Sequence, residues 1–208
     1  MIHSTTGLIL RTRPLTETSL IVNWLTPELG RISTVAKGAR RPKSAFAGKL
    51  DLFYLADFSF QRSQRSDLHT MREVKLRETH TALRQELGYL QQAAYCSALL
   101  IQATEMETPL PAAYNLLRTL LAHLPHQPPQ PQTLFAFEIK MLHELGLAPD
   151  LAQSHLTPGT RQIVAAFTAG DWPAVARLKL SDAQVHELRQ YLQGFLIFHL
   201  GRIPKGGR

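Results

Sequence analysis

Cysteine is nearly absent from this 208-residue sequence, which contains only Cys96. A single cysteine excludes an internal disulfide framework and any zinc site built from cysteines, and it is typical of a chain in a reducing compartment. Long apolar runs are also missing, because the N-terminal run follows no basic segment and stops at Arg11. We therefore expect neither a signal peptide nor a membrane anchor, and we predict a cytoplasmic protein with no membrane partner.

The motifs of common enzyme classes are missing as well. The sequence contains neither G-x-S-x-G nor G-x-G-x-x-G. The pair Gly48-Lys49 could belong to the phosphate-binding motif G-x-x-x-x-G-K-[ST]. That motif would need a glycine where Lys43 stands and a hydroxyl residue where Leu50 stands. Asp182 and His186 share one helix face, but an aspartate in a first helical turn already interacts with the helix dipole. We predict that the chain is not an enzyme and needs no cofactor.

Nine histidines raise the question of a metal site. They are scattered, and only His123 and His126 have the spacing of metal ligands. These two flank Pro125 at a predicted helix end, where imidazoles commonly interact with the helix dipole or with solvent. Zinc at this pair is the alternative, and we predict no bound metal.

Acidic residues are missing from one stretch in particular. The formal net charge is +7, and residues 1–80 hold 13 Lys and Arg against 7 Asp and Glu. Residues 31–49 contain no acid, and their cations are Arg31, Lys37, Arg40, Arg41, Lys43 and Lys49. Such a cluster is as often a solvated loop as a binding site. Here Gly38, Pro42 and Gly48 indicate a loop between ordered segments, where binding residues collect. A polyanionic partner is therefore expected, either nucleic acid or an acidic protein surface.

The first part of the chain alternates apolar and polar residues as β-strands do. The segments with this pattern are 6–12, 19–25, 31–37, 52–61 and 68–76. Five short strands joined by turns predict a small antiparallel barrel, of the five-stranded OB-fold type that binds oligonucleotides.

Beyond His80 the apolar residues recur at spacings of three and four, which is typical of amphipathic helices. The predicted helices are 81–105, 112–124, 133–146, 158–169, 172–178 and a last one that runs from a capping box at Ser181 through His199. We therefore predict an α+β fold with three parts: an N-terminal five-stranded OB-fold β-barrel at 1–79, a C-terminal α-helical bundle domain at 80–201, and a basic flexible tail at 202–208.

Recognition of nucleic acid by such a barrel would use cations for phosphates and aromatic rings for bases. The candidate rings are Trp24, Phe46, Tyr54, Phe58 and Phe60. Phe46 lies in the basic stretch between Lys43 and Lys49, whereas strand aromatics of a small barrel more often belong to its core. We therefore favour the cations over the aromatic residues as contacts.

Several segments together resemble the RecO family of bacterial recombination and repair proteins. These segments are Gly7-Leu-Ile-Leu-Arg11-Thr-Arg13, Glu17-Thr-Ser-Leu-Ile-Val22, Thr26-Pro-Glu-Leu-Gly-Arg31, Val35-Ala-Lys-Gly-Ala-Arg-Arg-Pro-Lys-Ser44, and Phe137-Glu-Ile-Lys-Met-Leu with Leu145-Gly-Leu-Ala-Pro-Asp150. The fourth segment is the most characteristic of the family. The order of the segments agrees with a barrel followed by a bundle.

The resemblance implies a protein that binds single- and double-stranded DNA, anneals complementary strands, and acts with RecR to replace single-strand binding protein by RecA on gapped DNA. RecA would be an indirect partner, and the protein would associate with the nucleoid. The expected DNA contacts are Arg11, Arg13, Arg31, Lys37, Arg40, Arg41, Lys43, Phe46 and Lys49. The acidic C-terminal tail of single-strand binding protein is expected to dock on the helical region, and we assign its contacts to Phe137, Lys140 and Met141.

The sequence departs from the family at one point. Many relatives carry two C-x-x-C pairs just after the position of residues 147–151, whereas this chain has Ala152-Gln-Ser-His-Leu-Thr157 followed by Pro158. We therefore predict a compact member without the zinc module. The alternative function is a protein-interaction adaptor whose bundle docks acidic peptides and contacts DNA only incidentally. Binding of an oligonucleotide and of an acidic peptide across a salt series would discriminate the two.

Overall fold

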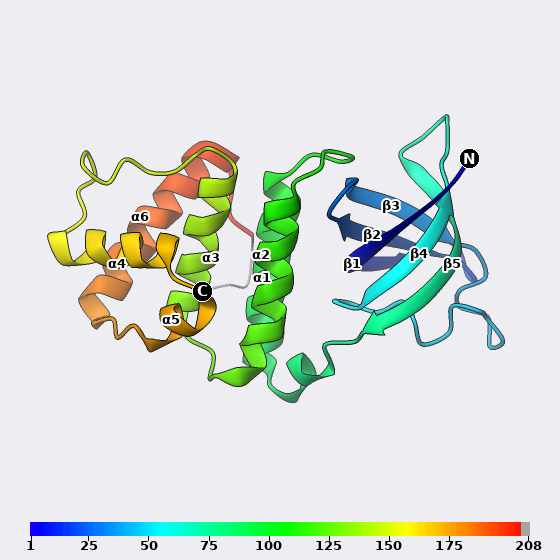
Figure 1. Cartoon of the computed structure of the whole chain (residues 1–208), viewed down its shortest axis with the longest axis horizontal. Helices are drawn as coiled ribbons and strands as arrows, with labels where there is room; N and C mark the ends of the chain where they lie inside the picture. Colours follow the sequence, from blue (N-terminus) through cyan, green and yellow to red (C-terminus); the bar gives the residue numbers. More distant parts are fainter. Residues whose placement is uncertain (205–208) are drawn as a thin grey trace. The chain divides into compact units, whose positions relative to one another are not determined.

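The computed structural model describes residues 1–204, so the predicted tail at 202–208 lies mostly outside the described residues. Five strands are followed by helices, as Figure 1 shows. The strands are β1 (Ile2–Pro14), β2 (Leu20–Thr26), β3 (Gly30–Ala36), β4 (Leu55–Gln61) and β5 (Leu68–Glu78). The α-helices are α1 (Leu87–Ala103), α2 (Pro111–His123), α3 (Pro131–Glu144), α4 (Pro158–Ala169), α5 (Trp172–Arg177) and α6 (Asp182–Leu200). Two short 3-10 helices are η1 (Thr81–Gln85) and η2 (Leu124–His126).

The strands close into a barrel in the order β1-β2-β3-β5-β4. All neighbours are antiparallel except β3 and β5, which run parallel over a short stretch. Strand β1 makes the closure possible, because its first half pairs with β4, its second half pairs with β2, and its register shifts between Ile9 and Arg11. The predicted five-stranded barrel followed by helices is confirmed.

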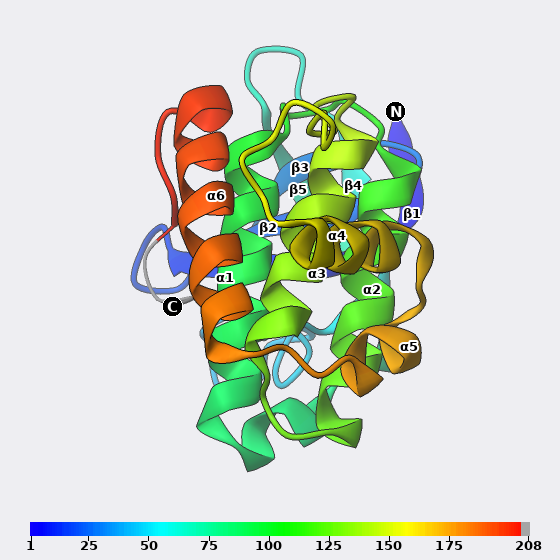
Figure 2. The same cartoon turned by 90° about the vertical axis from the view of Figure 1, so that its left-hand side faces the viewer.

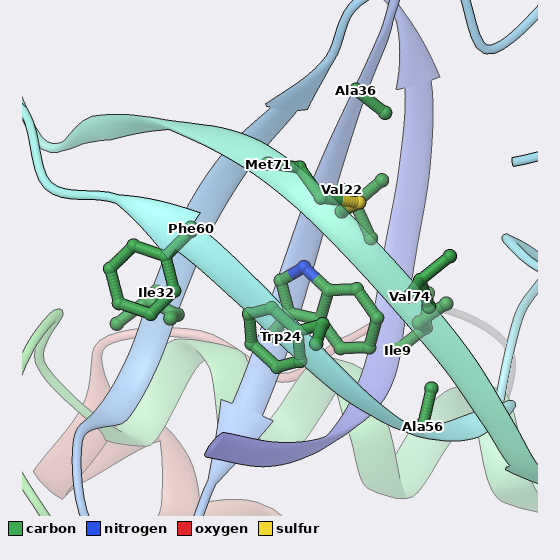
Figure 3. Packing of buried hydrophobic residues seen from close by; sticks show 10 residues of the cluster. Ile9, Val22, Trp24, Ile32, Ala36, Ala56, Phe60, Met71 and Val74 are labelled. Atoms are coloured by element: carbon green, nitrogen blue, oxygen red, sulfur yellow. The ribbon is translucent and has the colours of Figure 1, made fainter. Parts of the chain in front are cut away.

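The barrel core is built around Trp24. Figure 3 shows apolar side chains from all five strands gathered around this ring. Trp24 stacks on Phe58 with ring centroids 3.9 Å apart, and its Nε1 donates a hydrogen bond of 2.9 Å to Oγ1 of buried Thr34. Gly7 leaves room for this stack, since a Cβ there would lie 2.8 Å from the Phe58 ring. The core is therefore closed by rings that face inward.

The chain divides into two compact units. The first holds Met1–Thr81 together with Thr104–Asn115, and the second holds Ala82–Ala103 and the chain from Leu116. The segment Thr104–Asn115 joins the barrel unit at the start of β3, where Met106 forms a parallel bridge with Arg31. Gly30 permits this close approach: its φ is +67°, and a Cβ there would lie 2.1 Å from the Thr108 carbonyl oxygen.

Helix α3 is the centre of the second unit. It contacts α1, α4, α5 and α6, and Figure 2 shows α4 crossing it. The helix predicted at 81–105 is interrupted, because residues 81–85 form the 3-10 helix η1 and α1 begins only at Leu87. Among the described residues, no helix has the length and apolar content needed to cross a membrane.

Candidate nucleic-acid interface

The second part of the acid-free stretch forms an ordered loop between β3 and β4, which we call the basic loop (residues 37–49). Hydrogen bonds between backbone groups three residues apart repeat along the loop. The amides of Arg41, Ser44, Ala47 and Lys49 each donate to the carbonyl three residues earlier, at 3.1 Å. These consecutive turns satisfy the backbone without a helix or strand, so the loop has a defined shape.

Apolar side chains anchor the basic loop to the barrel. Ala39, Phe46 and Leu50 are half-buried and pack against the core cluster. The backbone N–H of Arg40 donates to the Thr18 carbonyl at 3.0 Å, which ties the loop to the β1–β2 connection. The loop therefore lies beside one of the two connections that carry ligand contacts in OB-folds.

The cations of the basic loop are accessible. Lys37, Arg40, Arg41 and Lys43 are exposed, and Lys49 is half-buried. Within residues 1–204, none of these five side chains forms an ion pair. Of the five side chains, the Arg40 guanidinium is the only one with a hydrogen bond to another of the described residues, from Nη1 to the Thr16 carbonyl at 3.4 Å. Their charges are therefore left for an external anion.

Two further cations lie at the same end of the barrel. Arg11 and Arg13 are exposed residues of β1, two positions apart and therefore on one face of the strand. Arg13 is paired with Ile21 at the start of β2, and Ile21 is paired in turn with Val35 at the end of β3, where the basic loop begins. The structure thus brings Arg11 and Arg13 to the edge of the basic loop, although they precede it by more than twenty residues.

Arg31 is different from the other predicted contacts. Its guanidinium is half-buried and donates to Thr104 twice, from Nε to Oγ1 at 2.8 Å and from Nη2 to the carbonyl oxygen. Burial lowers the pKa of Arg31 below its ordinary value, and the nearby charge of Glu105 opposes this effect. The side chain fastens Thr104–Asn115 to β3 and is not among the free cations. We therefore remove it from the interface.

Phe46 lies in the wall of an open groove of about 740 Å³ on the barrel unit. Lys49, Arg72 and Lys75 also line the groove, but so do three acids, Glu28, Asp57 and Glu73. Arg77 and Thr6 donate to the Asp57 carboxylate at 2.7 and 2.6 Å, and these hydrogen bonds hold the pKa of Asp57 below its ordinary value. The mixed charge makes the groove a poorer phosphate site than the basic loop.

One cation that the sequence patterns missed is Arg65. It is exposed in the β4–β5 hairpin, which is the second ligand-binding connection of OB-folds. Two arginines, Arg62 and Arg65, against Asp67 make no marked cluster of charge in the sequence, and only the fold points to Arg65. A neighbouring cation, Arg62, is paired with Glu107 and is not free.

Comparison with known proteins places the chain in a family. The family model described as Recombination protein O N terminal matches residues 1–80, and the one described as Recombination protein O C terminal matches residues 84–157. The chain belongs to the RecO family. Curated relatives named DNA repair protein RecO include one from Bacillus pumilus, 33% identical over 153 residues, and one from Symbiobacterium thermophilum, 35% identical over 158 residues. These alignments cover 74% and 73% of this chain but 59% of each relative, so the chain spans less than two thirds of their length.

The contacts predicted for an acidic tail on this RecO-family chain need correction. Phe137 and Met141 are 0% and 1% exposed, because α3 is enclosed by the other helices. The Nζ of Lys140 donates to the Thr168 and Gly170 carbonyls at 3.1 and 2.7 Å, at the end of α4. Burial lowers the pKa of Lys140 despite the nearby charges of Asp171 and Glu144. The apolar spacing that suggested a docking face is the core-facing pattern of a central helix.

The histidine pair also lacks the surroundings of a metal site. No group of three or more His, Cys, Asp or Glu residues that could hold a metal occurs within residues 1–204. His123 stacks on Trp172 with ring centroids 6.4 Å apart, and burial lowers the pKa of its imidazole. His123 is thus part of the packing of the second unit.

Hydrogen bonds hold the connection into α4, at residues 152–157, where the family resemblance led us to expect cysteine pairs that the sequence lacks. The amide and hydroxyl of Thr157 donate to the Glu187 carboxylate at 2.6 and 3.0 Å, and the Thr160 hydroxyl donates to it as well. Burial would raise the pKa of Glu187, but these hydrogen bonds outweigh it and hold the pKa below its ordinary value. A carboxylate on α6 thereby fixes the start of α4.

Proposed function

We propose that this RecO-family chain is a DNA repair protein that binds DNA through the basic loop and the β1 arginines. The observation that carries the proposal is the basic loop itself: an ordered, anchored loop with five cations that form no ion pair within residues 1–204. Together with Arg11 and Arg13 they form the phosphate-binding surface. The loop contacts are electrostatic and therefore suit single- and double-stranded DNA without sequence preference.

The role of the protein is non-enzymatic in this proposal. It anneals complementary strands and acts with RecR to exchange single-strand binding protein for RecA on gapped DNA, and it works at the nucleoid. The curated relatives, named DNA repair protein RecO, support the repair role.

A different surface is proposed for the acidic tail of single-strand binding protein. The second half of α6 carries Ile197 and Phe198, which are 44% and 84% exposed, and exposed Arg202 follows the end of the helix. No acid follows Glu187 in the sequence. Exposed apolar groups beside positive charge are what an acidic peptide with apolar residues requires. This surface replaces Phe137 and Met141 in the proposal.

The decisive experiment is annealing of complementary strands coated with single-strand binding protein, with and without RecR. We expect the chain to anneal the coated strands, and we expect Arg40→Ala/Arg41→Ala to slow annealing without loss of fold. A bare polycation of equal charge is the control, because it would anneal only uncoated strands. Failure to bind or anneal DNA at low salt would refute the proposal and leave the adaptor as the better explanation.

A further inference from the structure

The aromatic side chains of the barrel strands are stacked on one another. Trp24 stacks on Phe58, Phe58 lies 5.9 Å from Phe60 between ring centroids, and Phe60 lies between His3 and His69 at 5.6 and 5.2 Å. Trp24, Phe58 and Phe60 are at most 3% exposed. Their faces are therefore occupied by other rings of the same core and are closed to a nucleic-acid base.

The rings outside the strands are only partly accessible. Phe46 packs on the barrel core and anchors the basic loop, and half-buried Tyr54 packs on the same cluster. The large apolar side chains that are exposed in the barrel unit are Met1, Ile2 and Leu15, and none of these is aromatic. Among the described residues of this unit, the surface around the basic loop thus offers exposed cations, whereas the rings of Phe46 and Tyr54 are half-buried.

This combination differs from the usual single-strand binding surface. Proteins that hold single strands add aromatic platforms to a basic groove, and each stacked base then strengthens binding about fivefold or more. A surface of lysine and arginine alone contacts phosphates and gives the bases no binding partner.

We infer that the barrel unit binds a strand through its sugar-phosphate backbone. No protein ring stacks on the bases, which remain free to pair with a second strand. The inference rests on the proposed function and deepens it, because annealing requires that the bases of a bound strand remain accessible to a second strand. Long, flexible lysine and arginine side chains also adjust to phosphates in single and double strands alike, so the product duplex is tolerated on the same surface.

The groove beside Phe46 is the alternative place for a base. A base inserted there would contact the Phe46 ring, and its phosphates would meet a wall that mixes three cations with three acids: Lys49, Arg72 and Lys75 with Glu28, Asp57 and Glu73. The acids offset the attraction of the cations, so the groove favours a nucleotide less than the acid-free basic loop does. Insertion of a base is one of the outcomes that the experiment distinguishes.

The test compares the full chain on a 20-nucleotide oligo(dT) and on an abasic oligonucleotide of the same length. We expect dissociation constants within about twofold of each other at every salt concentration, with equal salt slopes. Weaker binding of the abasic strand by tenfold or more would overturn the inference while leaving DNA binding, and hence the proposed function, intact. Binding of neither strand at low salt would overturn both.

A second readout follows the bases directly. Permanganate oxidises thymines whose faces are open, and we expect the bound oligo(dT) to remain as reactive as the free strand. Protection of the thymines would contradict the inference, and protection of a small subset would indicate insertion into the groove. Lys37→Ala/Arg41→Ala/Lys43→Ala should weaken binding of both oligonucleotides by the same factor, which assigns the effect to the basic loop.

Discussion

Neutralising three cations of the basic loop should change the salt dependence of DNA binding by a calculable amount. The side chains of Lys37, Arg41 and Lys43 are exposed and make no ion pair within residues 1–204, so Ala at these positions should leave the free energy of unfolding within about 0.5 kcal/mol. Each phosphate neutralised on a single strand contributes about 0.7 to the slope of log K against log salt. Seven free cations at this end of the barrel give a slope of about −5, and four give about −3.

The assay is the affinity for oligo(dT) by fluorescence anisotropy between 50 and 200 mM salt, a range over which the slope of about −5 predicts a loss of about a thousandfold. The matched control is Arg118→Ala/Arg177→Ala/Lys179→Ala, which removes three exposed cations from the second unit and changes the net charge equally. We expect the control to retain the slope of the unmodified chain. Equal slopes for both triple variants would refute the assignment of DNA binding to the basic loop.

Three further predictions concern the units that carry the interface. Gly30→Ala should cost about 1–3 kcal/mol in urea unfolding, because φ is +67° and the new Cβ would meet the Thr108 carbonyl oxygen; an unchanged midpoint would contradict this strain. Thr34→Val should cost about 1–3 kcal/mol by leaving the Trp24 Nε1 donor unpaired in the core, whereas a neutral effect would show that the hydrogen bond is dispensable. Burial lowers the pKa of His123 from its ordinary value of 6.5, so its contribution to stability is present above that pH and is lost as the pH falls through the lowered pKa. In the His123→Gln variant, the melting temperature should therefore fall less between pH 7.5 and about 5 than in the unmodified chain. An equal fall in both proteins would contradict this role of His123.

The barrel was predictable because its strands carry a local signal. Ile32, Thr34 and Ala36 alternate with Ser33 and Val35, and the structure confirms β3 at Gly30–Ala36. The first half of β1 had no such signal, since residues 2–6 include His3 and three hydroxyl residues in a row. Its strand conformation comes from pairing with β4, which lies far along the chain.

The sequence predicted where the cations cluster, but not which of them are hydrogen-bonded to other parts of the protein. The charge count along the sequence identified the basic loop. The hydrogen-bond partner of Arg31 is Thr104, 73 residues away, so no local pattern showed that Arg31 is engaged. Periodicity likewise identified the apolar residues of α3 but could not tell that both Phe137 and Met141 are enclosed. Long-range contacts decide which side chains remain available, and sequence spacing does not report them.

The most direct test of the basic loop as the DNA interface is chemical-shift mapping of the ¹⁵N-labelled chain titrated with oligo(dT). We predict that the largest amide shifts fall on residues 37–49 and on Arg11 and Arg13, with none of comparable size on α6. The largest shifts on α6, or on the β4–β5 hairpin with the basic loop unaffected, would contradict the account.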